Sequence, residues 1–143
     1  MDISTRYMGL TLNNPIIVGS SGMTSTVDGI KQMADSGAGA VALKSLFEEE
    51  ILMEISKASG SPAVVNNYGE AADYMRYYVR EENVGKYLAL IEGAKKSVNI
   101  PVIASINCVS AGEWATFAKS IEQAGADALE LNIFIMPSDP KLT

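Results

Sequence analysis

The sequence predicts an α/β fold, the N-terminal half of a TIM (β/α)8 barrel. Short apolar, β-branched runs alternate with segments of helical spacing. Each predicted strand ends in polar residues, as strands do where an α/β barrel binds its ligand. These residues are Ser20-Ser21-Gly22, Lys44-Ser45, Ser105 with Asn107, and Asn132. A closed barrel takes about 250 residues, so 143 residues predict one domain, 1–143, with about four βα units and an N-terminal hairpin.

The first elements follow from turn residues and spacing. Residues 5–12 alternate loosely and end at an Asn-Asn-Pro bend, so we expect a hairpin or extra strand covering the barrel floor. Residues 16–18 form the first barrel strand, and a small polar loop follows. Apolar residues at helical spacing predict a helix over 26–36, stopped by Gly37.

The middle of the chain holds a strand and a segment without clear periodicity. Residues 40–43 form a buried strand that Lys44 ends. Residues 47–78 are the least regular part, with the acidic triplet Glu48–Glu50 and a tyrosine-rich stretch. We interpret this segment as a long βα loop whose apolar content argues for order.

Three further elements complete the pattern. Residues 84–98 carry an amphipathic stripe, and Pro101 precedes a strand over 102–107. Ser110 and Glu113 have capping-box spacing at the start of another helix. That helix ends at Gly125, and residues 128–133 form the fourth strand.

Strand alternation assigns the polar strand-end residues to one face. Side chains alternate across a strand, so one inward set follows: Ala40, Ala42, Lys44, Ile103, Ser105, Asn107, Ala128, Glu130 and Asn132. The other set, which faces the helices, is apolar and includes Cys108. The sorting of polar residues onto one surface favours the barrel.

Composition excludes several kinds of site. A net charge of −6 argues against a nucleic-acid partner, and the absence of histidine removes histidine bases and histidine metal ligands. One cysteine cannot form an internal disulfide or a cysteine metal cluster, so we expect no metal. No run is long enough to span a membrane, and residues 1–4 do not begin a signal peptide, so we expect a cytoplasmic protein without membrane contact.

Each candidate residue has a structural and a functional interpretation. A buried Lys44 needs a partner, which is either Glu130 or the acidic triplet, or else a ligand. The loop Ser20–Gly22 is either an ordinary turn or a backbone cradle. Asn107 and Asn132 either satisfy loop backbone groups or bind a planar ligand.

Six short motifs occur together in the order of a known family. They are Met8–Pro15, Gly19–Gly22, Ala42–Ser45, Asn66–Gly69, Pro101–Ile106 and Glu130–Asn132. This ordered set resembles the N-terminal half of the soluble, FMN-dependent dihydroorotate dehydrogenases, and it covers nearly the whole chain.

The resemblance implies an FMN oxidoreductase in which the flavin lies across the barrel mouth. It implies flavin contacts from Ser20, Ser21, Gly22, Lys44, Ser45, Ser105 and Asn132. It also implies substrate contacts from Lys44, Asn67 and Asn132. These groups would hold a small pyrimidine substrate for hydride transfer in pyrimidine biosynthesis, and the full-length protein would be a homodimer.

One loop departs from the family pattern. The family places a catalytic cysteine or serine soon after its Glu-Leu-Asn, whereas this chain has Ile135 or Met136 there, and neither accepts a proton. Ser138 is the candidate substitute. A related substrate therefore stays open beside dihydroorotate, and we expect the chain alone to be inactive.

Two other functions stay open. One is a non-redox barrel lyase or synthase that uses Lys44 as a Schiff-base amine. The other is an inactive half barrel that only self-associates through its open sheet edges.

Overall fold

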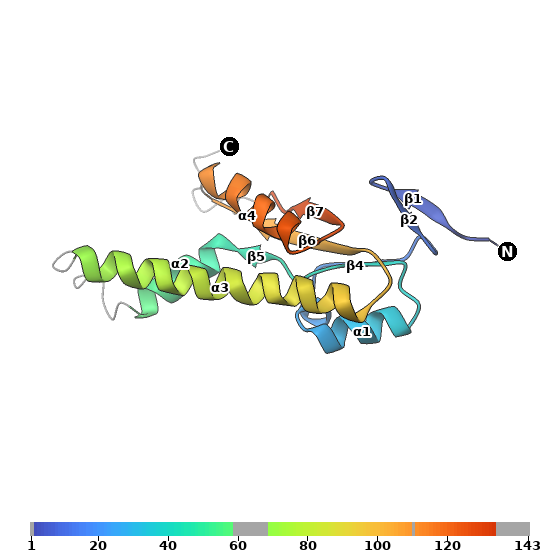
Figure 1. The fold of residues 1–143 in the computed structure, drawn as a ribbon, viewed down its shortest axis with the longest axis horizontal. Coiled ribbons are helices and arrows are strands. Elements are labelled where there is room, and N and C mark those ends of the chain that lie inside the picture. Colours follow the sequence, from blue (N-terminus) through green and yellow to red (C-terminus); the bar gives the residue numbers. More distant parts are fainter. Residues whose placement is uncertain (1, 59–68, 110, 134–143) are drawn as a thin grey trace, which may run out of the picture.

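A parallel β-sheet forms the centre of the molecule (Figure 1). The computed structural model describes residues 2–58, 69–109 and 111–133. Strands β3 (Ile17–Val18), β4 (Ala40–Ala42), β6 (Val102–Asn107) and β7 (Ala128–Leu131) lie side by side in chain order, all parallel. This neighbour-by-neighbour order is what successive βα units produce. The predicted α/β fold with a parallel sheet is confirmed.

Strand β6 has two successive partners along one edge. It pairs with β4 through Val102 and Ile103, and with β5 (Leu46–Phe47) through Ile106 and Asn107. The ladder is therefore interrupted opposite residues 104 and 105, where the chain leaves β4 before it enters β5. This interruption lies beyond the carboxyl end of β4 and beside the middle of β6.

In the described part of the chain, four α-helices and one 3-10 helix accompany the strands. The short η1 (Gly22–Thr24) precedes α1 (Val27–Asp35), whose first turn is capped by Thr26 accepting from the Gly29 amide at 3.1 Å. Gly37 and Gly125 adopt φ of 93° and 91° just beyond α1 and α4 (Ala111–Gln123), as glycines that end helices do. Both helix ends agree with the sequence prediction.

Between residues 47 and 78, the described residues beyond Phe47 are helical rather than irregular. Helix α2 (Glu48–Ala58) begins at the acidic triplet, and α3 (Gly69–Ser97) extends through the tyrosine-rich stretch. The prediction of a long loop was wrong because carboxylates favour a helix N-terminus. Buried Ile51 and Ile55 also give α2 an i, i+4 apolar face.

The N-terminal hairpin turns earlier than the Asn-Asn-Pro bend. Strands β1 (Thr5–Tyr7) and β2 (Leu10–Leu12) pair antiparallel around Met8 and Gly9, whose φ values are 51° and 79°. Positive φ at both central residues is the requirement of a tight type I′ hairpin. Asn14 instead fixes the chain to the end of α1, because its amide donates to the Gly37 carbonyl at 3.0 Å.

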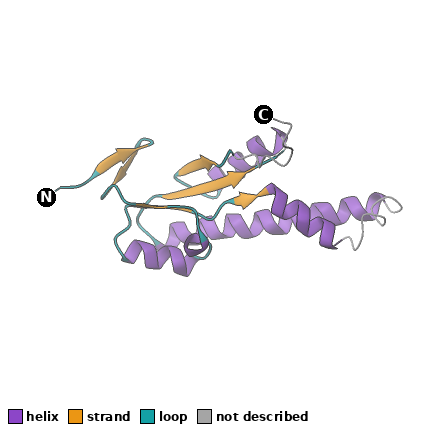
Figure 2. Ribbon diagram, turned by 180° about the vertical axis from the view of Figure 1, so that it is seen from behind, coloured by secondary structure: helices purple, strands orange, loops and turns teal. Residues whose placement is uncertain are grey.

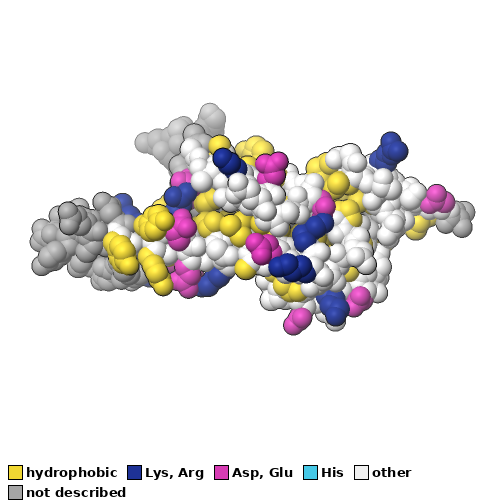
Figure 3. Space-filling view, in the orientation of Figure 1, with side chains coloured by type: hydrophobic (Ala, Val, Ile, Leu, Met, Phe, Trp, Pro, Cys, Tyr) yellow, Lys and Arg dark blue, Asp and Glu magenta, His cyan; other side chains and the backbone are white. Residues whose placement is uncertain are grey.

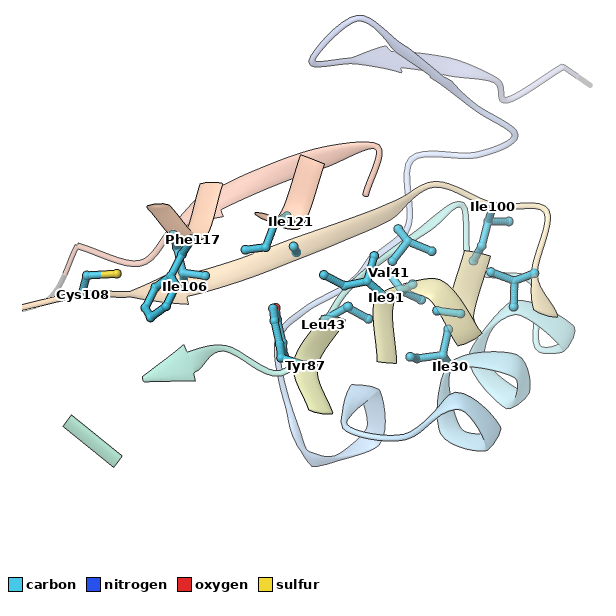
Figure 4. Close-up of a cluster of buried hydrophobic side chains, with 14 of the residues drawn as sticks. Ile30, Val41, Leu43, Tyr87, Ile91, Ile100, Ile106, Cys108, Phe117 and Ile121 are labelled. Carbon is cyan, nitrogen blue, oxygen red and sulfur yellow. The ribbon is translucent and has the colours of Figure 1, made fainter. Parts of the chain in front are cut away.

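The two faces of the sheet have different covers. Helices pack on one face against Val41, Leu43, Val102, Ala104 and Ile106, with Ile30, Ile91 and Phe117 opposite them (Figure 4). The hairpin lies on the other side, away from α1 and α3 (Figure 2), and Leu12 packs there with Ala40, Ala42 and Ile103. The predicted alternation of inward and helix-facing residues is confirmed for these positions.

Charged contacts hold the long helix α3 in place. Lys95 binds both carboxylate oxygens of Asp127 at 2.8 and 2.7 Å, and Asp127 also accepts from the Val102 amide at 2.7 Å. Arg80 pairs with Glu113 of α4 and lies over the Phe117 ring. Glu113 thus binds α3, and the predicted capping partner Ser110 lies outside the described residues.

The surface mixes charges of both signs. On the face shown in Figure 3, Lys and Arg side chains are interspersed with Asp and Glu, unlike the basic patches of nucleic-acid-binding proteins. Among the described residues, no helix is long and apolar enough to cross a membrane.

Candidate functional site

Three of the candidate residues meet beyond the ends of β3 and β4, beside the middle of β6. The Ser45 hydroxyl lies 3.0 Å from the Ser20 hydroxyl and 2.8 Å from the Ser105 hydroxyl, and the Ser45 amide donates to Ser20 Oγ at 2.9 Å. Ser20 follows β3, Ser45 follows β4, and Ser105 lies within β6. We call these three residues the serine cluster. Parallel strands bring their carboxyl ends to one edge, which is why residues so far apart in sequence meet.

Glu130 of β7 extends the serine cluster. The Ser105 hydroxyl donates to Glu130 Oε1 at 2.6 Å, and Ser105 is fully buried. An ionised carboxylate only accepts hydrogen bonds. The single hydroxyl hydrogen of Ser105 is therefore donated in the hydrogen bond to Glu130. Ser45 must then donate its hydrogen bond to Ser105, and Ser20 must donate to Ser45. The hydroxyls form one directed chain that starts at the exposed loop after β3.

Lys44 is exposed, not buried. Its side chain is 48% accessible, and its ammonium lies 3.9 Å from Glu50 Oε2. Glu130 binds Ser105 rather than Lys44, so the acidic triplet supplies the contact that the sequence left open. An exposed pair at this distance contributes little stability, and the ammonium can turn toward another anion.

The loop after β3 has an unpaired polar atom and open space. Ser21 Oγ is buried and has no hydrogen-bond partner among the described residues. A Cβ built on Gly19 or Gly22 would meet no atom within 4 Å. The backbone here is therefore accessible to a ligand, and one hydroxyl is available to bind it.

The asparagines have different outcomes. Asn107 donates from Nδ2 to the Asn132 carbonyl at 2.7 Å, joining the ends of β6 and β7. This contact confirms that Asn107 satisfies a loop backbone group. Asn132 lies at the same edge and is half-buried, and its backbone N–H donates to the Ile106 carbonyl. Asn67, Ile135, Met136 and Ser138 lie outside the described residues.

A hollow of about 130 Å³ adjoins the cluster on the hairpin side of the sheet. It is lined by Tyr7, Met8, Ile17, Gly19, Ala42, Ile103 and Glu130. Ile17, Ala42 and Ile103 of the sheet line one side of the hollow, and Tyr7 and Met8 of the hairpin line another. Glu130 thus lies between the serine cluster and the hollow.

Tyr87 is a polar contact that the sequence did not single out. Its hydroxyl accepts from the Ser105 amide at 2.8 Å and donates to the Ser105 carbonyl at 2.9 Å. Burial raises the pKa of Tyr87 to about 12, so the phenol stays protonated at neutral pH. The signal was available, since a tyrosine within an apolar stripe must find a partner for its hydroxyl.

Two further groups serve packing. Cys108 is buried among the helix-facing residues, and burial raises its pKa to about 11, which keeps it a thiol. Glu48 accepts from the Val109 amide at 2.6 Å and so ties α2 to the end of β6. Glu48 of the acidic triplet therefore has a structural contact as well as a place at the start of α2. Within the described ranges, no group of three or more potential ligand residues could hold a metal ion.

The sequence has curated relatives of a single kind. The chain is 30% identical to the dihydroorotate dehydrogenase B (NAD(+)) catalytic subunit of Thermoplasma volcanium over 92% of its own length. The subunits of the same name from Methanocaldococcus jannaschii and Pyrococcus furiosus are 31% and 32% identical over 92% and 93% of the chain. This chain resembles part of a dihydroorotate dehydrogenase. It spans 41% of the length of each of these relatives.

The remaining comparisons concern fold and family. No protein-family model matches the chain. A solved IMP dehydrogenase/GMP reductase-like protein from Corynebacterium glutamicum superposes with a TM-score of 0.51 at 14% identity, covering 98% of this chain and 38% of that one. This likeness supports the α/β fold alone. The dihydroorotate dehydrogenase resemblance inferred from the motifs is thus confirmed as a partial match.

Proposed function

We propose that residues 1–143 form the N-terminal half of an FMN-binding α/β barrel that transfers hydride to or from dihydroorotate or a related small substrate. The observation that carries this proposal is the serine cluster, which joins three candidate flavin contacts at the carboxyl ends of neighbouring strands. Barrel enzymes bind their ligands at this end. The partial match to dihydroorotate dehydrogenases supports the same reaction class.

The residues present fit a flavin. Ser21 Oγ is a buried polar atom that lacks a partner in the described structure, and the space beside Gly19 and Gly22 is open. A flat ring with several hydrogen-bonding atoms can lie against such a backbone and satisfy such a hydroxyl. FMN, when bound, supplies the hydride chemistry, and the protein supplies binding, orientation and electrostatics.

The chain's own residues would divide the remaining tasks. Lys44, weakly paired and exposed, would bring a positive charge to an anionic group of flavin or substrate. Asn132 and Asn67 would bind the substrate through their amides. Ser138 would take the proton, since Ile135 and Met136 cannot. These roles are proposals by resemblance.

The directed hydroxyl chain gives Ser20 a particular task. Because Ser20 donates to Ser45 and accepts from the Ser45 amide, its second lone pair stays available to a donor from the ligand side. Ser45 is fixed from both sides by Ser20 and Ser105. The three serine hydroxyls would therefore already be held in fixed orientations before the ligand binds, which lowers the entropic cost of binding.

A partner is part of the proposal. The curated relatives are named catalytic subunits, so we propose that a whole protein of this type works with a separate subunit, alongside the homodimer that the family resemblance implies. The Schiff-base alternative gains no support from Lys44. A Schiff-base lysine needs a desolvated pocket, whereas Lys44 is exposed.

Flavin absorption tests the proposal. We would purify the chain, together with whatever sequence adjoins it in its gene, and titrate it with FMN. We expect one flavin per chain, and Lys44→Met and Ser45→Val should each weaken binding by about tenfold or more. Lys57→Met, an exposed lysine on α2, is the matched control and should bind like the wild type. A protein that binds no FMN contradicts the proposal.

A further inference from the structure

Tyr87 occupies an unusual place between a helix and a strand. It projects from α3 toward β6 within the apolar layer (Figure 4). Its hydroxyl is engaged by both the amide and the carbonyl of Ser105, at 2.8 and 2.9 Å. One side chain thus binds both backbone groups of a single strand residue.

The strand needs such a contact at this position. Pairing of β6 with β4 ends at Ile103, and pairing with β5 begins at Ile106. Ser105 lies in the interval, where the neighbouring chain passes through Lys44 and Ser45 instead of continuing as a strand. A buried backbone amide without a partner is costly, and the phenol hydroxyl takes the place that a strand residue has in a continuous ladder.

Ser105 connects the two faces of the sheet. The Ser105 side chain lies on the hairpin side, where its hydroxyl binds Ser45 and Glu130 at 2.8 and 2.6 Å. Tyr87 belongs to the helix side and holds the Ser105 backbone. The position of the Ser105 hydroxyl therefore depends on Tyr87, which does not face the site. The hydrogen bonds of the serine cluster depend on Tyr87 for the same reason.

We propose that Tyr87 is a positioning residue: its hydroxyl fixes Ser105 in the interrupted part of β6 and thereby orients the serine cluster toward the ligand. This inference rests on the proposed flavin site and adds a residue to it. The phenol keeps its proton up to high pH, so the double contact persists across the physiological range.

Two readouts on the purified protein test this proposal, and the first does not involve flavin. In the wild type, the Ser105 amide should exchange with solvent deuterium as slowly as its β6 neighbours. In Tyr87→Phe, which keeps the ring and its packing, exchange at Ser105 should accelerate by about tenfold or more. Tyr78→Phe is the matched control, because Tyr78 lies on the same helix and is 58% exposed, and it should leave Ser105 unchanged.

The second readout is the FMN dissociation constant in a double-mutant cycle. Tyr87→Phe should weaken binding by about tenfold in the wild-type background but add little once Ser105→Ala has removed the hydroxyl. An equal effect in both backgrounds means a general structural role and overturns the proposal.

The two readouts separate the possible failures. Fast exchange of Ser105 in the wild type, or unchanged exchange in Tyr87→Phe, overturns the positioning role whether or not FMN binds. If the wild type binds no FMN, the proposed function fails by itself, and the exchange data still decide how Ser105 is held.

Discussion

The two faces of the sheet are built for different tasks. On the helix side, Val41, Leu43 and Ile106 are fully buried beneath α1, α3 and α4. On the hairpin side, Ala40, Ala42 and Ile103 pack with Leu12 of the hairpin, and Ala42 and Ile103 border a hollow of about 130 Å³. Large branched residues thus fill one side, and mainly small residues leave room on the other.

This difference shows where stability and function are separated. A close-packed layer resists changes of volume, so the helix side fixes the strands and the carboxyl ends that they present. The hairpin side carries the serine cluster, Glu130 and the open loop after β3. In a barrel, that side is the interior. Substitutions on the two sides should therefore differ in kind.

Removal of a large side chain from the helix side should have the largest effect. Ile106→Ala should lower the free energy of unfolding by about 2–5 kcal/mol, because Ile106 is fully buried in the larger cluster. Ile16→Ala, at a residue that is 63% exposed, should change it by less than about 0.5 kcal/mol. Urea unfolding followed by circular dichroism measures both. Similar losses in the two variants would show that the helix side is not the main core.

Alkaline pH should lower the free energy of unfolding by removing the contribution of Tyr87, whose hydroxyl holds Ser105. The pKa of Tyr87 is raised from 10.0 to about 12 in the folded chain, so the unfolded phenol loses its proton first. Its contribution is complete below pH 10 and is lost as pH rises through 12, by about 2–3 kcal/mol. Urea unfolding between pH 9 and pH 12 should show this loss in the wild type. Cys108, whose pKa is also raised, titrates in the same range and is present in both proteins. Tyr87→Phe should therefore lose less stability than the wild type over this pH range. Parallel pH profiles of the two proteins would contradict the role assigned to Tyr87.

Enlargement of an alanine should separate the faces most cleanly. Ala104→Leu adds the side chain to the close-packed helix side and should cost about 1–3 kcal/mol. Ala42→Leu directs the same change into the hollow and should cost less than about 1 kcal/mol. Thermal unfolding of the two variants measures the difference. Equal losses would mean that the hairpin side is packed as tightly as the helix side.

The ion pair at the amino end of the sheet should have the smallest effect. Lys95→Met removes the partner of Asp127 and should cost about 1 kcal/mol or less, decreasing as salt is added. The neighbouring Lys96→Met, which breaks only an exposed contact with Glu92, should be nearly silent. Urea unfolding at low and high salt measures both variants. If the two substitutions change the free energy of unfolding equally, α3 is held by packing alone.

Much of this organisation could be predicted from the sequence. Apolar alternation gave the strands and both faces, and strand-end polarity brought Ser20, Ser45 and Ser105 to one edge before any geometry was known. The helix over Glu48–Ala58 was missed because the exposed Leu52 and Met53 follow Ile51 directly and hide the i, i+4 spacing of the buried Ile51 and Ile55. Exposure of Lys44 was missed because it depends on how far the chain diverges after β4, which is a tertiary property.

The contact between Tyr87 and Ser105 could not be predicted for a related reason. It follows from an interruption in strand pairing, and register is set by the whole sheet. Glu130 was placed on the correct face, but its partner Ser105 emerged only from side-chain geometry. Sequence patterns therefore place residues on faces, whereas hydrogen-bond partners require the assembled fold.

The most direct test is to locate FMN on the protein by amide chemical-shift changes in two-dimensional NMR during a titration. We predict saturable shifts at Ser20–Gly22, Ser45 and Ser105, with the amides of α1 and the last turns of α3 unchanged. Shifts confined to the helix side, or none at all, would contradict a flavin site on the hairpin side of the sheet.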